Sequence, residues 1–158
     1  MPMISIERRE LVAQPILFIR RQAAQSEIAD VLGQCLGMVF GHCQKAGHAV
    51  AGQPFTRYPS AGPGLVTLEA GCPLAAPVPG DGEIEAGFLQ SGAAAVAVHA
   101  GPYDQLRETY SAVERWMEDQ GQRSGGPPWE VYVTDPGDYP DPKDWRTEVY
   151  WPIAGHSE

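Results

Sequence analysis

The chain has 158 residues, of which 43% are hydrophobic and 20% charged, and its formal net charge is −9 at pH 7. This length fits about one globular domain with a single hydrophobic core. With only 11 scattered Lys and Arg residues, the composition argues against nucleic acid as a partner and favours cations.

No targeting or metal-binding pattern stands out. The start, MPMISIERRE, carries charges and no apolar run of signal-peptide length, and no later segment approaches a membrane span, so we expect a cytoplasmic protein with no membrane partner. The three cysteines form no CxxC pair, which argues against a disulfide framework and a zinc site. Cys35, Cys43 and Cys72 are therefore interpreted as small core residues, and no metal or cofactor is predicted.

The first half of the chain predicts one strand, one helix and two further strands. ELVAQPILFIRRQ crowds apolar residues over 16–19, which is typical of a central strand. From Ser26 to Ala46 apolar residues recur at three- and four-residue steps, which indicates a helix with Ser26 as N-cap and Gly47 just past its end. Strands follow at 54–59 and 64–74, before the turn-rich PVPGDG.

The second half predicts the same kinds of element. EIEAGFLQ and AAVAVHAG are expected to be strands, and helical spacing runs from about Tyr103 to Gln120, before Gly121. WEVYVTD and WRTEVYWPI are the closing strands, joined by the turn-rich PGDYPDPKD.

The two halves resemble each other. Shifted by 74 positions, Leu32 falls on Leu106 and Gly47 on Gly121, and at a slightly longer shift EAGCPLA matches EVYWPIA. We therefore predict a single domain over 1–158, with an internal repeat at about 12–75 and 93–154. The expected fold is α+β: duplicated strand-helix-strand-strand modules forming a pseudo-twofold antiparallel sheet, with helices on one face and a ligand cleft on the other.

Strand alternation sorts the residues of this sheet. In the last strand Glu148 points with Arg146 and Tyr150, away from Val149, and in the matching strand Glu69 points away from the apolar set. We expect Tyr58 and Tyr132 to join both glutamates on the concave face. Phe55 and Trp129, which match each other in the repeat, are expected to fill the interface between helix and sheet.

Two segments carry a family resemblance. HAGPYDQLRETYSAVERWMEDQG, followed by WEVYVTDPGDYPDPKDWRTEVYWPI, resembles the GyrI-like small-molecule-binding family, which is similar to the effector-binding domains of multidrug-responsive transcription regulators. The resemblance implies a cleft that holds flat, lipophilic, often cationic molecules between aromatic side chains over an acid, which maps onto Glu148. In those regulators a DNA-binding helix-turn-helix precedes the domain. The sequence leaves no room for one, so we do not expect a transcription factor.

Acidic and aromatic side chains are the candidate ligand-binding residues, because aromatic faces and carboxylates attract organic cations. They are Glu148, Glu69, Tyr58, Tyr103, Tyr110, Tyr132, Tyr139, Trp145 and Tyr150. Each also has a structural alternative: Glu148 could pair with Arg146, Tyr110 could belong to the core, and Tyr139 and Trp145 could anchor a loop instead of forming a lid.

Three functions follow as expectations. The first is a stand-alone binding protein for lipophilic, cationic or polyaromatic small molecules, as in multidrug binding and detoxification. The alternative is a hydrolase that opens the cyclopropane ring of DNA-alkylating natural products, since the terminal segment looks closest to that branch of the family. In that case Glu148 would be the catalytic base, and His99 or a tyrosine hydroxyl would be the proton donor. Inhibition of a protein partner by the acidic surface is a third class, which no motif supports.

Overall fold

The computed structural model describes residues 5–61, 64–134 and 137–154. The chain divides into two compact units: unit 1 comprises Met1–Leu11 and Gly92–Glu158, and unit 2 comprises Val12–Ser91. Within the described ranges, neither helix is long and apolar enough to span a membrane.

Unit 2 is a four-stranded antiparallel sheet with one helix packed on it, in the strand order β3-β4-β2-β5. Its core lies between α1 and the sheet, where the side chains of Leu17, Ile19, Leu68 and Val39 are fully buried. Its elements are β2 (Gln14–Ala24), η1 (Gln25–Glu27), α1 (Ile28–Ala46), β3 (Phe55–Ala61), β4 (Leu65–Pro73) and β5 (Glu85–Leu89).

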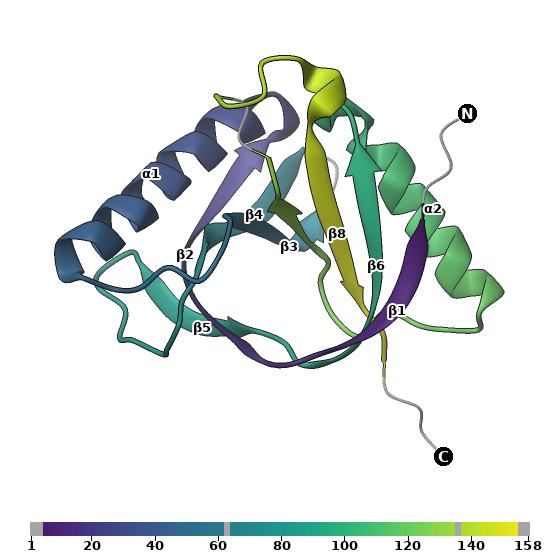
Figure 1. Ribbon diagram of the computed structural model, residues 1–158, viewed down its shortest axis with the longest axis horizontal. Coiled ribbons are helices and arrows are strands. Elements are labelled where there is room, and N and C mark those ends of the chain that lie inside the picture. Colours follow the sequence, from purple (N-terminus) through teal and green to yellow (C-terminus); the bar gives the residue numbers. More distant parts are fainter. Residues whose placement is uncertain (1–4, 62–63, 135–136, 155–158) are drawn as a thin grey trace. The chain divides into compact units, whose positions relative to one another are not determined.

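Unit 1 repeats this plan in the strand order β1-β6-β8-β7 (Figure 1). Ala95, Ala97 and Val149 of the sheet pack against Val113 and Met117 of α2. Its elements are β1 (Ile6–Leu11), β6 (Gly92–Ala100), η2 (Tyr103–Gln105), α2 (Leu106–Asp119), β7 (Trp129–Tyr132), η3 (Pro142–Asp144) and β8 (Arg146–Pro152).

Both units therefore follow the order strand, 3-10 turn, helix, strand, strand. In each sheet the two later strands lie on one side of the first, and an extra strand lies on its other side: β5 in unit 2 and β1 in unit 1. The predicted α+β fold with antiparallel strands is confirmed. The central strand predicted within ELVAQPILFIRRQ is confirmed as β2, which starts at Gln14 and lies between β4 and β5. The first residues of that segment, Glu10 and Leu11, belong instead to β1, which pairs with β6.

The predicted helix ends are partly correct. Gly47 takes a left-handed conformation (φ 75°) directly after α1, as a glycine cap does, and Gly121 (φ 67°) follows α2. Ser26 is not the N-cap, because it lies inside η1. There the Glu27 carboxylate accepts a hydrogen bond from the Ala24 backbone N–H at 3.2 Å.

The three cysteines are core residues, as predicted. Cys35, Cys43 and Cys72 are free thiols and at most 2% exposed. The Cys43 and Cys72 sulfurs lie 3.6 Å apart, and burial raises the pKa of the Cys72 thiol to about 12. All three thiols therefore fill space in the core. Burial raises the pKa of Cys35 as well, so Cys35 and Cys72 remain protonated at neutral pH.

Glu130 of β7 is a buried acid on the side of the unit 1 sheet that α2 covers. Glu130 is 5% exposed and accepts hydrogen bonds from the hydroxyls of Tyr110 and Tyr132, both at 2.7 Å. Burial raises the pKa of the Glu130 carboxyl, and the two tyrosine hydroxyls oppose that rise. Deprotonation of Glu130 at higher pH therefore places a charge in a site that the fold desolvates.

Glycine-to-alanine changes at two positions in unit 2 should act in opposite directions. A Cβ at Gly71 would collide with the Leu17 carbonyl oxygen and the Phe18 Cα of the neighbouring strand, and backbone cannot yield as a side chain does. At Gly33, in the interior of α1, a Cβ meets nothing within 4 Å. We expect Gly71→Ala to lower the free energy of unfolding by more than about 2 kcal/mol and Gly33→Ala to raise it by about 0.5–1 kcal/mol. Urea denaturation of both variants measures this, and equal shifts would contradict the close packing of β2 on β4.

Glu130→Gln should make unfolding less dependent on pH. Because the native pKa of Glu130 is raised, its contribution to stability is complete below the ordinary pKa of about 4.3 and is lost as pH rises through the native value. The stability difference, Glu130→Gln minus wild type, should therefore grow between pH 4.5 and pH 8. Urea denaturation across this range tests it, with Glu114→Gln on the exposed side of α2 as the matched control. A constant difference would show that Glu130 is no harder to ionise in the folded protein than in the unfolded chain.

Candidate ligand-binding site

Strand β8 places Glu148 on the sheet face opposite α2. Val149 is 0% exposed and packs in the α2 core, so its neighbours Glu148 and Tyr150 point the other way. We call this side of the unit 1 sheet the helix-free face. It carries Glu148 and Tyr150 from β8, Val98 from β6, Trp129 and Val131 from β7, and Arg9 from β1.

Glu148 and Tyr150 form a hydrogen-bonded pair on this face. The Tyr150 hydroxyl donates to Glu148 Oε1 at 2.8 Å. Burial raises the pKa of Tyr150 to about 12, the hydrogen bond and charge of Glu148 add to the rise, and Arg9 opposes it. Tyr150 is therefore a neutral donor at physiological pH. No other hydrogen bond or ion pair reaches the Glu148 carboxylate from the described residues. The salt bridge to Arg146, considered as the structural alternative for Glu148, is not formed.

Trp129 stacks on the aromatic ring of this pair. It lies directly opposite Tyr150 in the β7–β8 ladder, and the two rings stack with centroids 5.5 Å apart and planes 8° apart. The prediction that Trp129 fills the interface between helix and sheet is wrong, since the register places it on the helix-free face. The pairing of β7 with β8 was the missing information, because it decides which alternate residues of WEVY join Glu148.

Three of the predicted tyrosines lie on the other side of the same sheet. Tyr132 is opposite Thr147 and so faces α2, which contradicts the expectation that it shares a face with Glu148. Tyr110 projects from α2 to Glu130, and Tyr103 packs against the α2 core with its ring 5.7 Å from that of Tyr132. These tyrosines support the helix–sheet interface.

Trp145 holds the loop before β8 in place through its indole N–H and its ring. Trp145 Nε1 donates to the Tyr139 carbonyl oxygen at 2.6 Å, and the Trp145 ring lies 4.7 Å from that of Tyr103. Tyr139 is 45% exposed. Trp145 thus anchors this loop to the start of α2, which matches the structural alternative considered for it.

His99 lies on the α2 side and uses both ring nitrogens. Nε2 is 2.8 Å from the Pro102 carbonyl oxygen, which can only accept, so this nitrogen carries the proton. Nδ1 is 2.8 Å from the Thr109 hydroxyl and accepts from it in the neutral ring. His99 is opposite Thr147, on the face away from Glu148, so the geometry does not support its proposed role as a catalytic proton donor.

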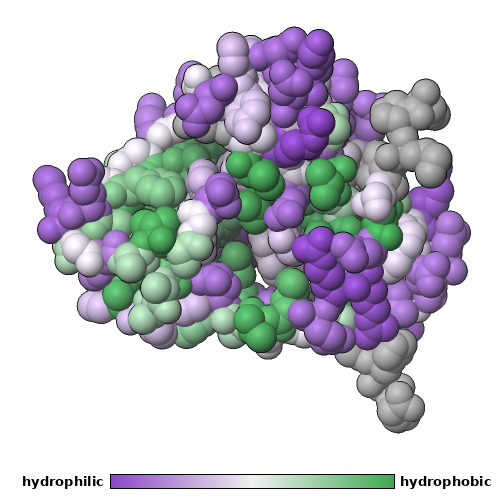
Figure 2. Space-filling model, viewed as in Figure 1, coloured by the Kyte–Doolittle hydropathy of each residue, from purple (hydrophilic) through white to green (hydrophobic). Residues whose placement is uncertain are grey.

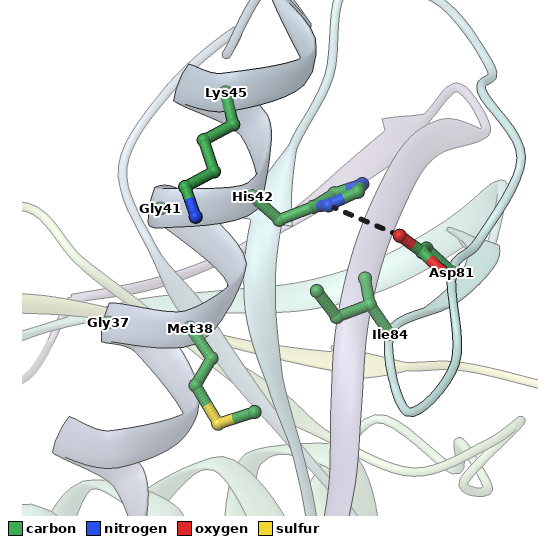
Figure 3. A pocket seen from close by; sticks show the side chains of 7 residues that line it. All are labelled: Gly37, Met38, Gly41, His42, Lys45, Asp81 and Ile84. Atoms are coloured by element: carbon green, nitrogen blue, oxygen red, sulfur yellow. Dashed lines mark ion pairs between the residues drawn. The ribbon is translucent and has the colours of Figure 1, made fainter.

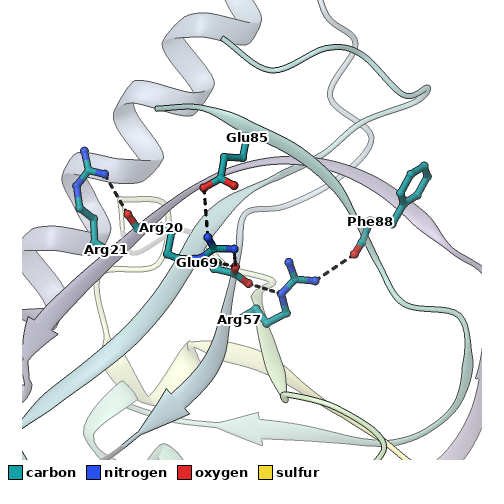
Figure 4. Close-up of polar contacts among 6 residues, drawn as sticks. All are labelled: Arg20, Arg21, Arg57, Glu69, Glu85 and Phe88. Carbon is teal, nitrogen blue, oxygen red and sulfur yellow. Dashed lines mark hydrogen bonds and ion pairs between the residues drawn. The ribbon is translucent and has the colours of Figure 1, made fainter. Parts of the chain in front are cut away.

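In unit 2 the equivalent acid, Glu69, is fully paired (Figure 4). Arg20 donates to Oε2 at 3.0 and 2.7 Å, and Arg57 donates to Oε1 at 2.6 Å. Glu69 is 3% exposed, and both guanidinium groups also lie over the Phe18 ring. The predicted company of Tyr58 is absent, because Tyr58 packs against the α1 core instead.

A surface pocket of about 470 Å³ lies beside α1 and contains none of the predicted site residues (Figure 3). Gly37 and Gly41 leave space there because they lack side chains, and His42 lies 3.9 Å from Asp81. In Figure 2 the surface over α1 is mostly pale to green, in keeping with the small and apolar residues of this helix.

Comparisons with known proteins agree with this fold. No curated protein matches the sequence significantly. The solved structure of the EcmrR C-terminal domain is similar, with 21% identity, a TM-score of 0.85, and 96% of this chain and 98% of that chain covered. In the EcmrR–DNA complex the match spans 58% of the EcmrR chain and 97% of this one, with the same identity and TM-score.

Two further structures are more distant. SAV2435 bound to tetraphenylphosphonium is 14% identical with a TM-score of 0.59, covering 96% of this chain and 94% of that one. A hydrolase from Listeria innocua is 12% identical with a TM-score of 0.65, covering 94% of this chain and 91% of that one. The model of the GyrI-like small molecule binding domain matches residues 4–154, and the chain therefore belongs to the GyrI-like small molecule binding domain family.

Proposed function

We propose that this chain binds lipophilic organic cations, and that the helix-free face of unit 1 recognises them. Glu148 supplies the negative charge, and the half-buried ring of Tyr150 supplies the aromatic surface, held in place by the buried Trp129 ring stacked on it. The Tyr150 hydroxyl orients the carboxylate through its hydrogen bond to Oε1.

The contrast between the two equivalent glutamates carries this proposal. Glu69 has arginines directly opposite it on both neighbouring strands, Arg20 on β2 and Arg57 on β3. Glu148 has valines at the same two positions, Val98 on β6 and Val131 on β7. One acid is neutralised within the fold, whereas the other lies among apolar and aromatic side chains with its charge available to a ligand.

The energetics favour a large, diffuse cation over a small hydrated one. A cation over an aromatic face gains about 0.5–2 kcal/mol, and a carboxylate in a partly dehydrated setting adds attraction that water would screen. Apolar neighbours such as Val98, which is 42% exposed, reward a ligand with hydrophobic surface. SAV2435, which shares the fold, was solved with the lipophilic cation tetraphenylphosphonium and supports this choice of ligand class.

Glu148→Gln is the first test of the proposal. The substitution removes the charge and keeps the bulk, so we expect binding of tetraphenylphosphonium to weaken by about 1–3 kcal/mol. Triphenylphosphine oxide, a neutral aryl compound, should lose much less affinity. Isothermal titration calorimetry of both ligands measures the difference, and Glu69→Gln is the matched control, since its carboxylate is occupied by arginine. Equal losses for the cation and the neutral compound would mean that Glu148 does not recognise charge.

A second candidate function is the hydrolytic opening of a cyclopropane ring, which the Glu148–Tyr150 hydrogen bond favours. This hydrogen bond holds the Glu148 carboxylate, as a base, next to the Tyr150 hydroxyl, as a neutral proton donor. Glu148 would take a proton from water as the water oxygen bonds to a ring carbon. In the substrate, a carbonyl group is conjugated to the cyclopropane ring. The electron pair of the C–C bond that breaks would pass to the oxygen of this carbonyl, which Tyr150 would protonate. The Listeria innocua relative described as a hydrolase shares the fold.

An activity assay separates this candidate from simple binding. If the chain is a hydrolase, the ring-opened product of a cyclopropane-bearing DNA alkylator should form faster than in buffer. Glu148→Gln should lower kcat at least about 100-fold and Tyr150→Phe should lower it too, while both variants still bind the compound. Product formation by wild type at the buffer rate would contradict the hydrolase and leave the binding function unaffected.

A further inference from the structure

Strand β1 brings a cationic side chain to the helix-free face. β1 is the edge strand of unit 1, and its register places Glu7 opposite Val96, which is in turn opposite Tyr150. Arg9 is opposite Ala94, one step further along the same face. Arg8 and Glu10 alternate to the other side.

Arg9 is shared between two acidic environments. Its Nε and Nη2 donate to Glu7 Oε1 at 3.0 and 2.6 Å, and its side chain is 40% exposed while that of Glu7 is 60% exposed. The hydrogen bond to Glu7 is the main cause that raises the pKa of Arg9, and Tyr150 and Glu148 contribute to the same rise. The guanidinium therefore lies within electrostatic reach of the Glu148–Tyr150 pair.

On the helix-free face, only short side chains of β6 lie between Arg9 of β1 and Tyr150 of β8. β6 contributes Ala94 and Val96, two short side chains, to the space between β1 and β8. Two strand spacings separate β1 from β8, roughly 10 Å. The long side chain of Arg9 and the hydroxyl of Tyr150 can therefore approach each other above these short side chains.

We propose that Arg9 is a tethered cation that competes with the ligand for Glu148, and that Glu7 is the acid that holds Arg9 while a ligand is bound. This inference rests on the proposed function and adds Arg9 as a residue that sets how strongly a cation must interact with Glu148 in order to bind. A ligand must offer Glu148 more than the guanidinium does, so weakly interacting cations are excluded. Glu7 lowers that threshold because it offers Arg9 an alternative partner.

The test is a double-mutant cycle on tetraphenylphosphonium binding, measured by calorimetry on the full chain. Arg9→Gln should tighten binding about three- to ten-fold, because the internal competitor is gone. Glu7→Gln should weaken binding by a similar factor, because Arg9 then loses its Glu7 partner and is free to approach the Glu148–Tyr150 pair. In the double variant the effect of Glu7→Gln should vanish, since Glu7 acts through Arg9.

The pair Arg8 and Glu10 is the matched control. It lies on the same strand and has the same charges, but its 3.6 Å ion pair is on the opposite face. Arg8→Gln and Glu10→Gln should change affinity less than two-fold. If Arg9→Gln and Arg8→Gln have equal effects, or if the Arg9 and Glu7 effects simply add, the competition is refuted and only long-range charge remains.

A ligand-free measurement separates this inference from the proposed function. In the carboxyl ¹³C NMR spectrum, Glu7→Gln should shift the Glu148 resonance as Arg9 moves toward it, and Glu10→Gln should not. If Glu148→Gln leaves cation binding unchanged, the proposed function and the competition both fall, and a Glu7-dependent shift would show Arg9 to be only an internal partner of Glu148. If Glu148→Gln weakens binding while Arg9→Gln does nothing, only the inference about Arg9 falls.

Discussion

The pairing of β8 with a strand on each side is the constraint on which the candidate site depends. A strand bonded at both edges cannot slide by one residue without exchanging its two faces, and in β8 such a slip would bury Glu148 and expose Val149. The α2 core, where Val149 has no exposed surface, fixes the register. The position of Glu148, the candidate ligand-binding acid, is thus a by-product of hydrophobic packing on the opposite side of the sheet.

The two units show how one scaffold can use the same acid in two ways. Glu69 with its arginines is a buried network whose partial disruption leaves uncompensated charge, so each member depends on the others. In unit 1 valines replace both arginines, and the acid is held by a neutral hydroxyl. The two cross-strand neighbours therefore distinguish the arginine-paired Glu69 from Glu148, the acid that we propose for ligand recognition.

The two helices and the face of β8 that carries Glu148 were predictable from the sequence. The helices and the seven-residue strand β8 each have a regular apolar side that packs in the core. The faces of β7 were not predictable, because its four residues give a misleading pattern. Trp129 and Val131 form the more apolar set, yet the sheet turns Glu130 and Tyr132 toward α2, where they satisfy each other with Tyr110. A polar set that completes its own hydrogen bonds can occupy a core face, and hydrophobic patterning alone does not reveal it. The arginine partners of Glu69 were equally hidden, since they depend on the registers of three strands.

The route of the chain through unit 1 has a consequence for biosynthesis. β1 is synthesised before unit 2, but its partner β6 starts at Gly92, after all of unit 2 has been made. At typical rates of synthesis β1 waits on the order of ten seconds without a partner strand. During that time its run of Glu7, Arg8, Arg9 and Glu10 keeps an exposed strand edge charged, which disfavours pairing with other chains. The charges of Glu7 and Arg9, which we propose to act at the candidate site in the folded protein, would thus also disfavour aggregation of the nascent chain before folding is complete.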